Sequence, residues 1–190
     1  MNLKTQNKKN MKKSILVMKS FVLAGALLFV SCNDDDGITC PEAITGELNG
    51  AETAFVGTWA LSGMIAEDAI DLTDDSEDNP SEDLYVQYSE CDRDLVYNFV
   101  SDRNYTYKQG SVAEDCNNEQ SLVGTWGLTS ENRLMLVANC SSQAVTIEIG
   151  ESSDEFSYDA NLTFKDATGA VKTTKVTFTY TKQAEEVTPE

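Results

Sequence analysis

The sequence predicts an all-β protein, with about eight antiparallel strands arranged as an up-and-down β-barrel. Apolar and polar residues alternate almost everywhere from residue 55 onward, no stretch carries the apolar stripe of a helix, and short polar turns separate successive strands. Strands with one apolar and one polar face are typical of an antiparallel sheet wrapped around a core. A β-sandwich is the alternative, but short turns favour up-and-down order over Greek-key crossovers.

The alternation is clearest near the end of the chain, where Phe156, Tyr158 and Phe164 point to one face and Asp159 and Lys165 to the other. The expected elements, in chain order, are a strand at 55–64, an acidic loop at 71–83, a short strand or helical turn at 84–88, a hairpin of 95–99 with 105–107, a second hairpin of 122–129 with 133–138, and strands at 145–149, 155–165 and 175–181.

The N-terminal segment has the layout of an export signal. Lysines at 12 and 13 precede an apolar run over 20–30, which is too short to span a membrane comfortably, and Cys32 follows a small residue. This order resembles a bacterial lipoprotein signal. The resemblance implies that Cys32 carries lipid and becomes the first residue of the mature protein, with palmitate among its acyl chains. A plain secretion signal or an uncleaved anchor is the alternative.

The acidic run over 33–36 resembles the signals that send some lipoproteins to the cell surface of certain Gram-negative bacteria. We therefore expect an outer-membrane, surface-exposed, lipid-anchored protein, with an inner-leaflet periplasmic location as the alternative. The predicted domains are a signal peptide at 1–31, an acidic tether at 32–53, the barrel at 54–182 and a flexible tail at 183–190.

Charge excludes one class of partner. Six of the 14 basic residues lie before Cys32 and none of the 32 acidic residues does, so the chain from Cys32 onward carries eight basic residues and a formal charge of −24. Such a surface repels phosphate backbones, so nucleic-acid binding is not expected, and the membrane contact must come from the lipid.

The absence of histidine restricts the chemistry. Without it the chain has no Ser-His-Asp or Cys-His machinery and no His-ligated metal. No nucleophile–base arrangement is visible, so we expect no enzyme and no cofactor. The acidic loop offers oxygen ligands for calcium but lacks the spacing and central glycine of an EF-hand, so we interpret it as a solvated charge run. Its acids are Asp71, Asp74, Asp75, Glu77, Asp78, Glu82 and Asp83.

Four cysteines remain besides Cys32, an even number that indicates two disulfides in an exported chain. If the 95–109 hairpin pairs around its turn, Cys91 lies opposite residue 114 or so and close to Cys116. This predicts a Cys91–Cys116 bond and leaves Cys40 to pair with Cys140, fastening the end of the tether to the barrel.

A Gly-Thr-Trp motif occurs twice, at Gly57–Trp59 and at Gly124–Trp126. Together with Cys91, the first hairpin, Cys116 and the lipoprotein signal, it resembles the bacterial lipocalin-like domain lipoproteins. In that family the tryptophan of the first strand plugs one end of an eight-stranded barrel and the glycine permits close backbone approach. Two departures are notable.

One departure is Arg103-Asn104, which stands where the family commonly has glycine in the turn. The other is the lack of a clear arginine on the last strand to pack on Trp59, where Lys175 or Lys182 is the available substitute. Core packing is the favoured role of Trp59 and Trp126, and lining of a ligand cavity is the alternative.

The resemblance implies a non-catalytic barrel that binds a small hydrophobic ligand. The inward aromatic residues of the strands either line such a pocket or fill the barrel, and filling is slightly favoured. The alternative function is a surface-displayed module that binds protein or glycan through its loops, with no ligand in a cavity.

Overall fold

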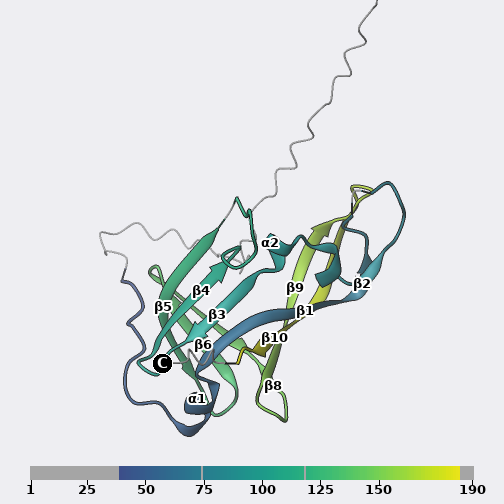
Figure 1. The fold of residues 1–190 in the computed structure, drawn as a ribbon. Helices are drawn as coiled ribbons and strands as arrows, with labels where there is room; N and C mark the ends of the chain where they lie inside the picture. The colour runs from purple at the N-terminus through teal and green to yellow at the C-terminus, as the bar shows by residue number, and fades with distance from the viewer. Residues whose placement is uncertain (1–38, 74, 118, 185–190) are drawn as a thin grey trace, which may run out of the picture. The chain divides into compact units, whose positions relative to one another are not determined.

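The structure, a computed structural model, describes residues 39–73, 75–117 and 119–184. Over these residues the chain forms ten strands, all paired antiparallel, and three short helical segments (Figure 1). The strands are β1 (Gly57–Ile70), β2 (Ser81–Asp83), β3 (Leu95–Phe99), β4 (Asn104–Gln109), β5 (Gln120–Leu128), β6 (Arg133–Ala138), β7 (Ser141–Thr146), β8 (Glu148–Ile149), β9 (Glu155–Lys165) and β10 (Val171–Lys182). The helical segments are α1 (Gly50–Phe55), the 3₁₀ turn η1 (Tyr85–Gln87) and α2 (Glu90–Arg93).

The sheet nearly closes on itself. Its strand order is β7-β6-β5-β4-β3-β1-β10-β9-β8, with β2 added to β1. The first and last strands of this order follow one another in the chain, separated only by Ile147. Taken as one strand that changes partner, β7 and β8 complete an eight-stranded up-and-down barrel, in which β1 meets β10. The predicted all-β, lipocalin-like barrel is confirmed.

Strand alternation places the core as expected. Along β9, Phe156 and Phe164 are buried, whereas Asp159 and Lys165 on the opposite face are exposed. The first hairpin pairs Leu95 with Gln109, within a residue of the register inferred from its turn.

One end of the barrel is closed by aromatic side chains. Phe55 of α1 lies 4.8 Å from Trp59 and 5.2 Å from Phe156 between ring centroids, and Phe99 lies 5.1 Å from Trp126. All five are at most 3% exposed. Burying each such ring stabilises the fold by roughly 1.5–3 kcal/mol, so these rings contribute strongly to the stability of this end.

The prediction that a strand begins at residue 55 is wrong by two residues, because residues 50–55 form α1 instead. Asn49 and Glu52 form a capping box: each side chain accepts a hydrogen bond from the backbone N–H of the other. This reciprocal arrangement starts a helix in a segment that has no apolar periodicity.

The predicted boundary of the tether at residue 53 is also incorrect. The described residues from 39 onward belong to the same compact unit as the barrel. Ile44 donates its N–H to Thr125 Oγ1 at 2.9 Å, and Glu52 is 3% exposed. Polar anchoring of this kind leaves no signature in hydrophobic periodicity. The signal peptide, Cys32 and residues 185–190 of the predicted tail lie outside the described residues.

The structure decides between the short strand and the helical turn that the sequence allows at residues 84–88. Residues 85–87 form the 3₁₀ turn η1, and the end of the predicted loop, 81–83, is the short strand β2.

No helix among the described residues is long and apolar enough to cross a membrane.

Candidate functional site

The first Gly-Thr-Trp motif lies at the closed end of the barrel. Trp59 is fully buried and donates its indole N–H to Phe55 O at 2.9 Å. Of the two lysines that the sequence offers as partners of Trp59, Lys182 of β10 makes the contact. Its Nζ lies 5.3 Å from the Trp59 ring centroid and donates to Ala54 O at 2.8 Å. The indole, the last strand and α1 are thereby held together.

Glycine is required beside this tryptophan. Gly57 has φ +139°, a backbone conformation that side chains with a Cβ rarely adopt. A Cβ there would also lie 2.6 Å from Lys182 Cε, so it would block the path of the lysine. The Gly-x-Trp spacing therefore serves the cation–π contact.

The second motif has a different reason for its glycine. Trp126 is fully buried and donates its indole N–H to Val100 O at 3.0 Å. A Cβ on Gly124 would lie 2.2 Å from Val137 O and 2.7 Å from a Tyr105 ring carbon. The glycine thus makes room for Tyr105 and β6, and both tryptophans pack in the core at this end.

A buried ion pair fastens α1 and the segment before it to the β3–β4 turn. Arg103, at φ +72°, forms a salt bridge with Glu52, in which Nη1 contacts Oε1 and Nη2 donates to Oε2 at 3.0 Å. The guanidinium also donates to Gly46 O at 3.1 Å and Glu47 O at 2.7 Å.

The carboxylate of this pair is fully engaged. Besides the Arg103 contacts, Glu52 accepts the backbone N–H groups of Asn49 at 2.8 Å and Leu128 at 2.9 Å. Burial alone would raise the pKa of Glu52, but these hydrogen bonds and the arginine charge outweigh it and hold the pKa below its ordinary value. Sequence reasoning missed this site. Its one signal was an arginine at a turn position where the resembled family commonly has glycine.

Away from the plugged end, the inward face of β3, β4 and β5 is less completely buried. Tyr97, Tyr107 and Leu122 form a row across β3, β4 and β5, with Tyr97 paired to Tyr107 and Tyr107 to Leu122. These side chains share the inward face of their strands with Phe99 and Trp126, yet all three are only partly buried. Along β3, β4 and β5 the inward face therefore changes from buried to partly buried, whereas Leu61 and Met64 of β1 and Val176 of β10 remain at most 4% exposed. We call the partly buried part of the inward face the mouth; other partly buried apolar side chains that belong to it are Leu95, Tyr158 and Leu162.

Phenol groups gather inside the mouth. Tyr97 of β3 and Tyr180 of β10 meet across the barrel, with ring centroids 5.4 Å apart, and Tyr180 is hydrogen-bonded to Tyr158. Burial, and then the proximity of the other phenols, raises the pKa of Tyr97 and Tyr180 well above the ordinary value and that of Tyr107 to about 12. The hydroxyls are neutral at physiological pH, so they offer hydrogen bonds without charge.

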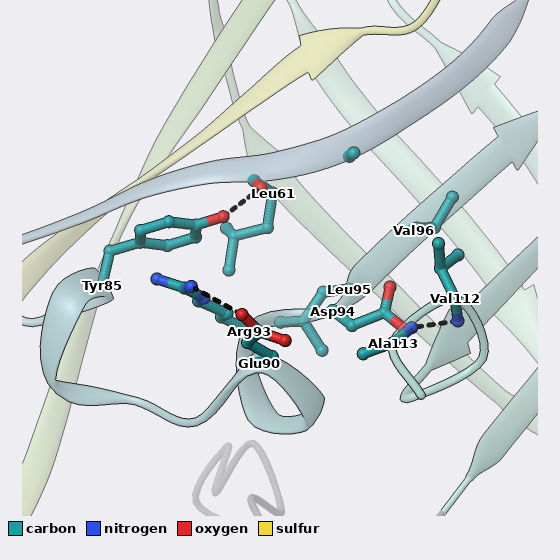
Figure 2. A pocket seen from close by; sticks show the side chains of 10 residues that line it. Leu61, Tyr85, Glu90, Arg93, Asp94, Leu95, Val96, Val112 and Ala113 are labelled. Atoms are coloured by element: carbon teal, nitrogen blue, oxygen red, sulfur yellow. Dashed lines mark hydrogen bonds and ion pairs between the residues drawn. The ribbon is translucent and has the colours of Figure 1, made fainter. Parts of the chain in front are cut away.

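A hollow of about 280 Å³, lined in part by Leu61 and by Leu95 of the mouth, lies where β1 and β3 diverge beyond the Ala60–Val96 pair. Figure 2 shows Tyr85 reaching over Arg93, with its hydroxyl 3.3 Å from Leu61 O; the guanidinium carbon lies 5.0 Å from the Tyr85 ring centroid.

The charged groups of this hollow are already engaged. Arg93 is 3.9 Å from a Glu90 oxygen, and Asp94 accepts the N–H groups of Val112 and Ala113 at 2.6 and 3.0 Å (Figure 2). These contacts stabilise the loops that line the hollow.

The two predicted disulfides are present. Cys91 bonds to Cys116 beside the first hairpin, and Cys40 bonds to Cys140 after β6. The second bond joins residues 100 positions apart and fixes the segment before α1 to the barrel.

The acidic loop engages its carboxylates within itself. Asp71 accepts the backbone and hydroxyl groups of Thr73 at 3.0 and 2.8 Å, and Asp75 accepts the N–H of Glu77 at 2.9 Å. Within the described part of the chain, no group of three or more His, Cys, Asp or Glu residues is placed to hold a metal ion.

Fold and site together define a small antiparallel barrel with a plugged end, a partly open end and two disulfides. Residues 33–183 match the family described as Domain of unknown function (DUF5004), and the chain belongs to that family. No curated protein matches the chain.

Proposed function

We propose that this protein is a lipid-anchored lipoprotein of the Gram-negative cell envelope whose barrel binds a small hydrophobic ligand without catalysis. The observation that supports the ligand is the difference in burial along β3–β5: Phe99 and Trp126 are fully buried at the plugged end, whereas the inward side chains of the mouth are only partly buried. Ligand sites are typically concave and apolar, with a few convergent polar groups.

The chemistry of the mouth favours a neutral ligand that combines apolar surface with a hydrogen-bond acceptor. Tyr97, Tyr107 and Tyr158 supply aromatic faces, and their raised pKa keeps the hydroxyls protonated. The formal charge of −24 from Cys32 onward disfavours an anionic ligand.

Lipid anchoring is supported by the signal that ends at Cys32. We expect Cys32→Ala to move the protein from the outer-membrane fraction to the soluble fraction and to remove the acyl mass. An unmodified Cys32, or membrane retention of the alanine variant, would contradict the anchor while leaving the ligand proposal standing.

Ligand binding is tested by titration with N-phenyl-1-naphthylamine, a neutral apolar dye whose fluorescence rises on leaving water. We expect saturable binding that Leu122→Glu weakens at least tenfold, since it places a charge in the mouth. Its matched control is Val123→Glu, because Val123 is the next residue on the outward face and is 64% exposed. Absence of binding, or equal loss in both variants, would contradict the proposal and favour a module that binds through its loops.

A further inference from the structure

The barrel is left open along part of β9. β8 pairs with β9 only at Glu148–Ser157 and Ile149–Phe156. Beyond that point β9 continues to Lys165 with β10 as its one partner among the described strands, and β7 likewise pairs only with β6. Two strand edges, one on β7 and one on β9 over 158–165, therefore border a gap in the sheet.

Apolar side chains of the interior are reachable at this gap. Phe156, the last inward residue of β9 that β8 covers, is 1% exposed. The next three inward residues, Tyr158, Ala160 and Leu162, are all only partly buried, whereas Phe164 near the end of the strand is 7% exposed. The change in exposure coincides with the end of the β8 pairing.

The edges lack the usual protection against added strands. Natural edge strands carry charges, proline or bulges that block pairing with another chain. β7 has the sequence Ser-Ser-Gln-Ala-Val-Thr, without charge or proline, and between Tyr158 and Phe164 the only charged residue of β9 is Asp159. The β9–β10 register is unbroken from Val171–Lys165 to Thr181–Glu155, so no bulge bends this edge away.

We propose that the gap accepts an extended segment of another polypeptide, which adds as a strand along the free edge of β9. Backbone groups of that edge would give affinity, and alternate apolar side chains would contact Tyr158 and Leu162. The matching length is about eight residues, that of 158–165. This inference goes beyond the proposed function, but Tyr158 and Leu162 also belong to the mouth, so an added strand and a ligand would share these two side chains.

Charge selects the partner. Glu148 and Glu155 are exposed beside the paired end of the gap, Asp159 within it is 3.4 Å from Lys175 Nζ of β10, and Lys165 lies at its far end. The chain from Cys32 onward has a formal charge of −24, so a second copy of this protein would be repelled. An extended segment with apolar residues on one face and basic residues on the other fits best.

The test uses full-length protein, in phosphatidylcholine nanodiscs if it carries lipid and in buffer otherwise. The probe is a fluorescent eight-residue peptide of alternating valine and lysine, and its control has the same composition ordered as Val-Val-Lys-Lys repeats. By fluorescence anisotropy, we expect the alternating peptide to bind at least tenfold more tightly. Hydrogen exchange should show new protection over 158–165.

Two variants locate the contact. Leu162→Lys places a charge on the inward face, whereas the control Thr163→Lys adds the same charge on the outward face of the next residue. We expect the first to weaken peptide binding at least tenfold and the second to change it less than threefold. If Leu162→Lys does not fold, hydrogen exchange over 158–165 in the unmodified protein tests where the peptide binds.

Equal affinity for the two peptides, or protection elsewhere in the chain, would overturn the proposal. Self-association that protects 158–165 and is lost in Leu162→Lys would also overturn it, since a second copy would then occupy the gap. The naphthylamine titration is a separate measurement, so failure here leaves the ligand proposal untouched.

Discussion

Arg103 is the residue on which the closed end of the barrel depends. Its guanidinium reaches Gly46, Glu47 and Glu52 from a turn between β3 and β4. A buried charge that loses its partner is costly, whereas replacement of both partners by apolar groups is often tolerated.

We expect Arg103→Met to lower the free energy of unfolding by about 3–5 kcal/mol, because Glu52 would remain buried and unpaired. The double variant Arg103→Met with Glu52→Leu should be more stable than Arg103→Met alone. Urea unfolding monitored by tryptophan fluorescence measures both. A loss below about 1 kcal/mol in the single variant would show that water reaches Glu52.

The same pair gives the fold a pH dependence. Since the pKa of Glu52 is lower in the folded protein than its ordinary value of 4.5, its contribution is fully present above pH 4.5 and is lost as pH falls through the folded pKa. Compared with Glu52→Gln, the unmodified protein should therefore lose more stability between pH 5 and pH 3, values that bracket the ordinary pKa. Parallel unfolding curves of the two proteins across this range would contradict the assignment.

Gly124 and Gly63 provide a matched pair in β5 and β1. A Cβ on Gly124 meets Val137 O at 2.2 Å, whereas one on Gly63 meets its nearest atom, Thr179 Cβ, at 3.5 Å. Gly124→Ala should cost at least about 1–3 kcal/mol, as overpacking does, and Gly63→Ala about 1 kcal/mol or less. Similar melting temperatures for the two variants would show that β6 moves away without cost.

At the scale of elements, strand alternation and turn chemistry predicted most of the barrel. The β3–β4 hairpin and the Cys91–Cys116 bond followed from the alternation around one turn, because a hairpin register is local. α1 could not be predicted in the same way, since it is held by the capping box of Asn49 and Glu52 and by the distant Arg103. Such polar contacts depend on the finished fold.

The candidate site was likewise predictable from the sequence only in part. The two tryptophans and the lysine on the last strand were identifiable by motif, and the structure places Lys182 rather than Lys175 at Trp59. The mouth could not be identified from a motif. Period-two alternation places Phe156 and Tyr158 on the same face, but it does not show where the pairing of β8 with β9 ends.

The two disulfides should differ in how much they contribute to the free energy of unfolding. Cys40–Cys140 closes a loop between residues 100 positions apart. Removing it by paired serine substitutions should lower the free energy of unfolding by about 4.7 kcal/mol, from chain entropy. Removing Cys91–Cys116, with a separation of 25, should cost less, roughly 3–4 kcal/mol. Denaturant unfolding of the two double-serine variants checks the order; a larger loss from the 25-residue bond would contradict it.

At the scale of the whole molecule, the barrel combines a fixed end with an accessible one. α1, Trp59, Lys182 and the Glu52–Arg103 pair stabilise the first. Figure 1 shows β3–β5 and β9–β10 spreading apart toward the end that carries α2 and β2. A ligand held in the mouth would leave the plugged end undisturbed, so binding is expected without a large change of fold.

Native mass spectrometry of the protein isolated from its own envelope tests ligand binding by the barrel. We expect one small apolar molecule above the covalent mass, released on denaturation, absent from Leu122→Glu and retained by Val123→Glu. A native mass equal to the denatured mass in all three proteins would contradict a ligand-binding barrel.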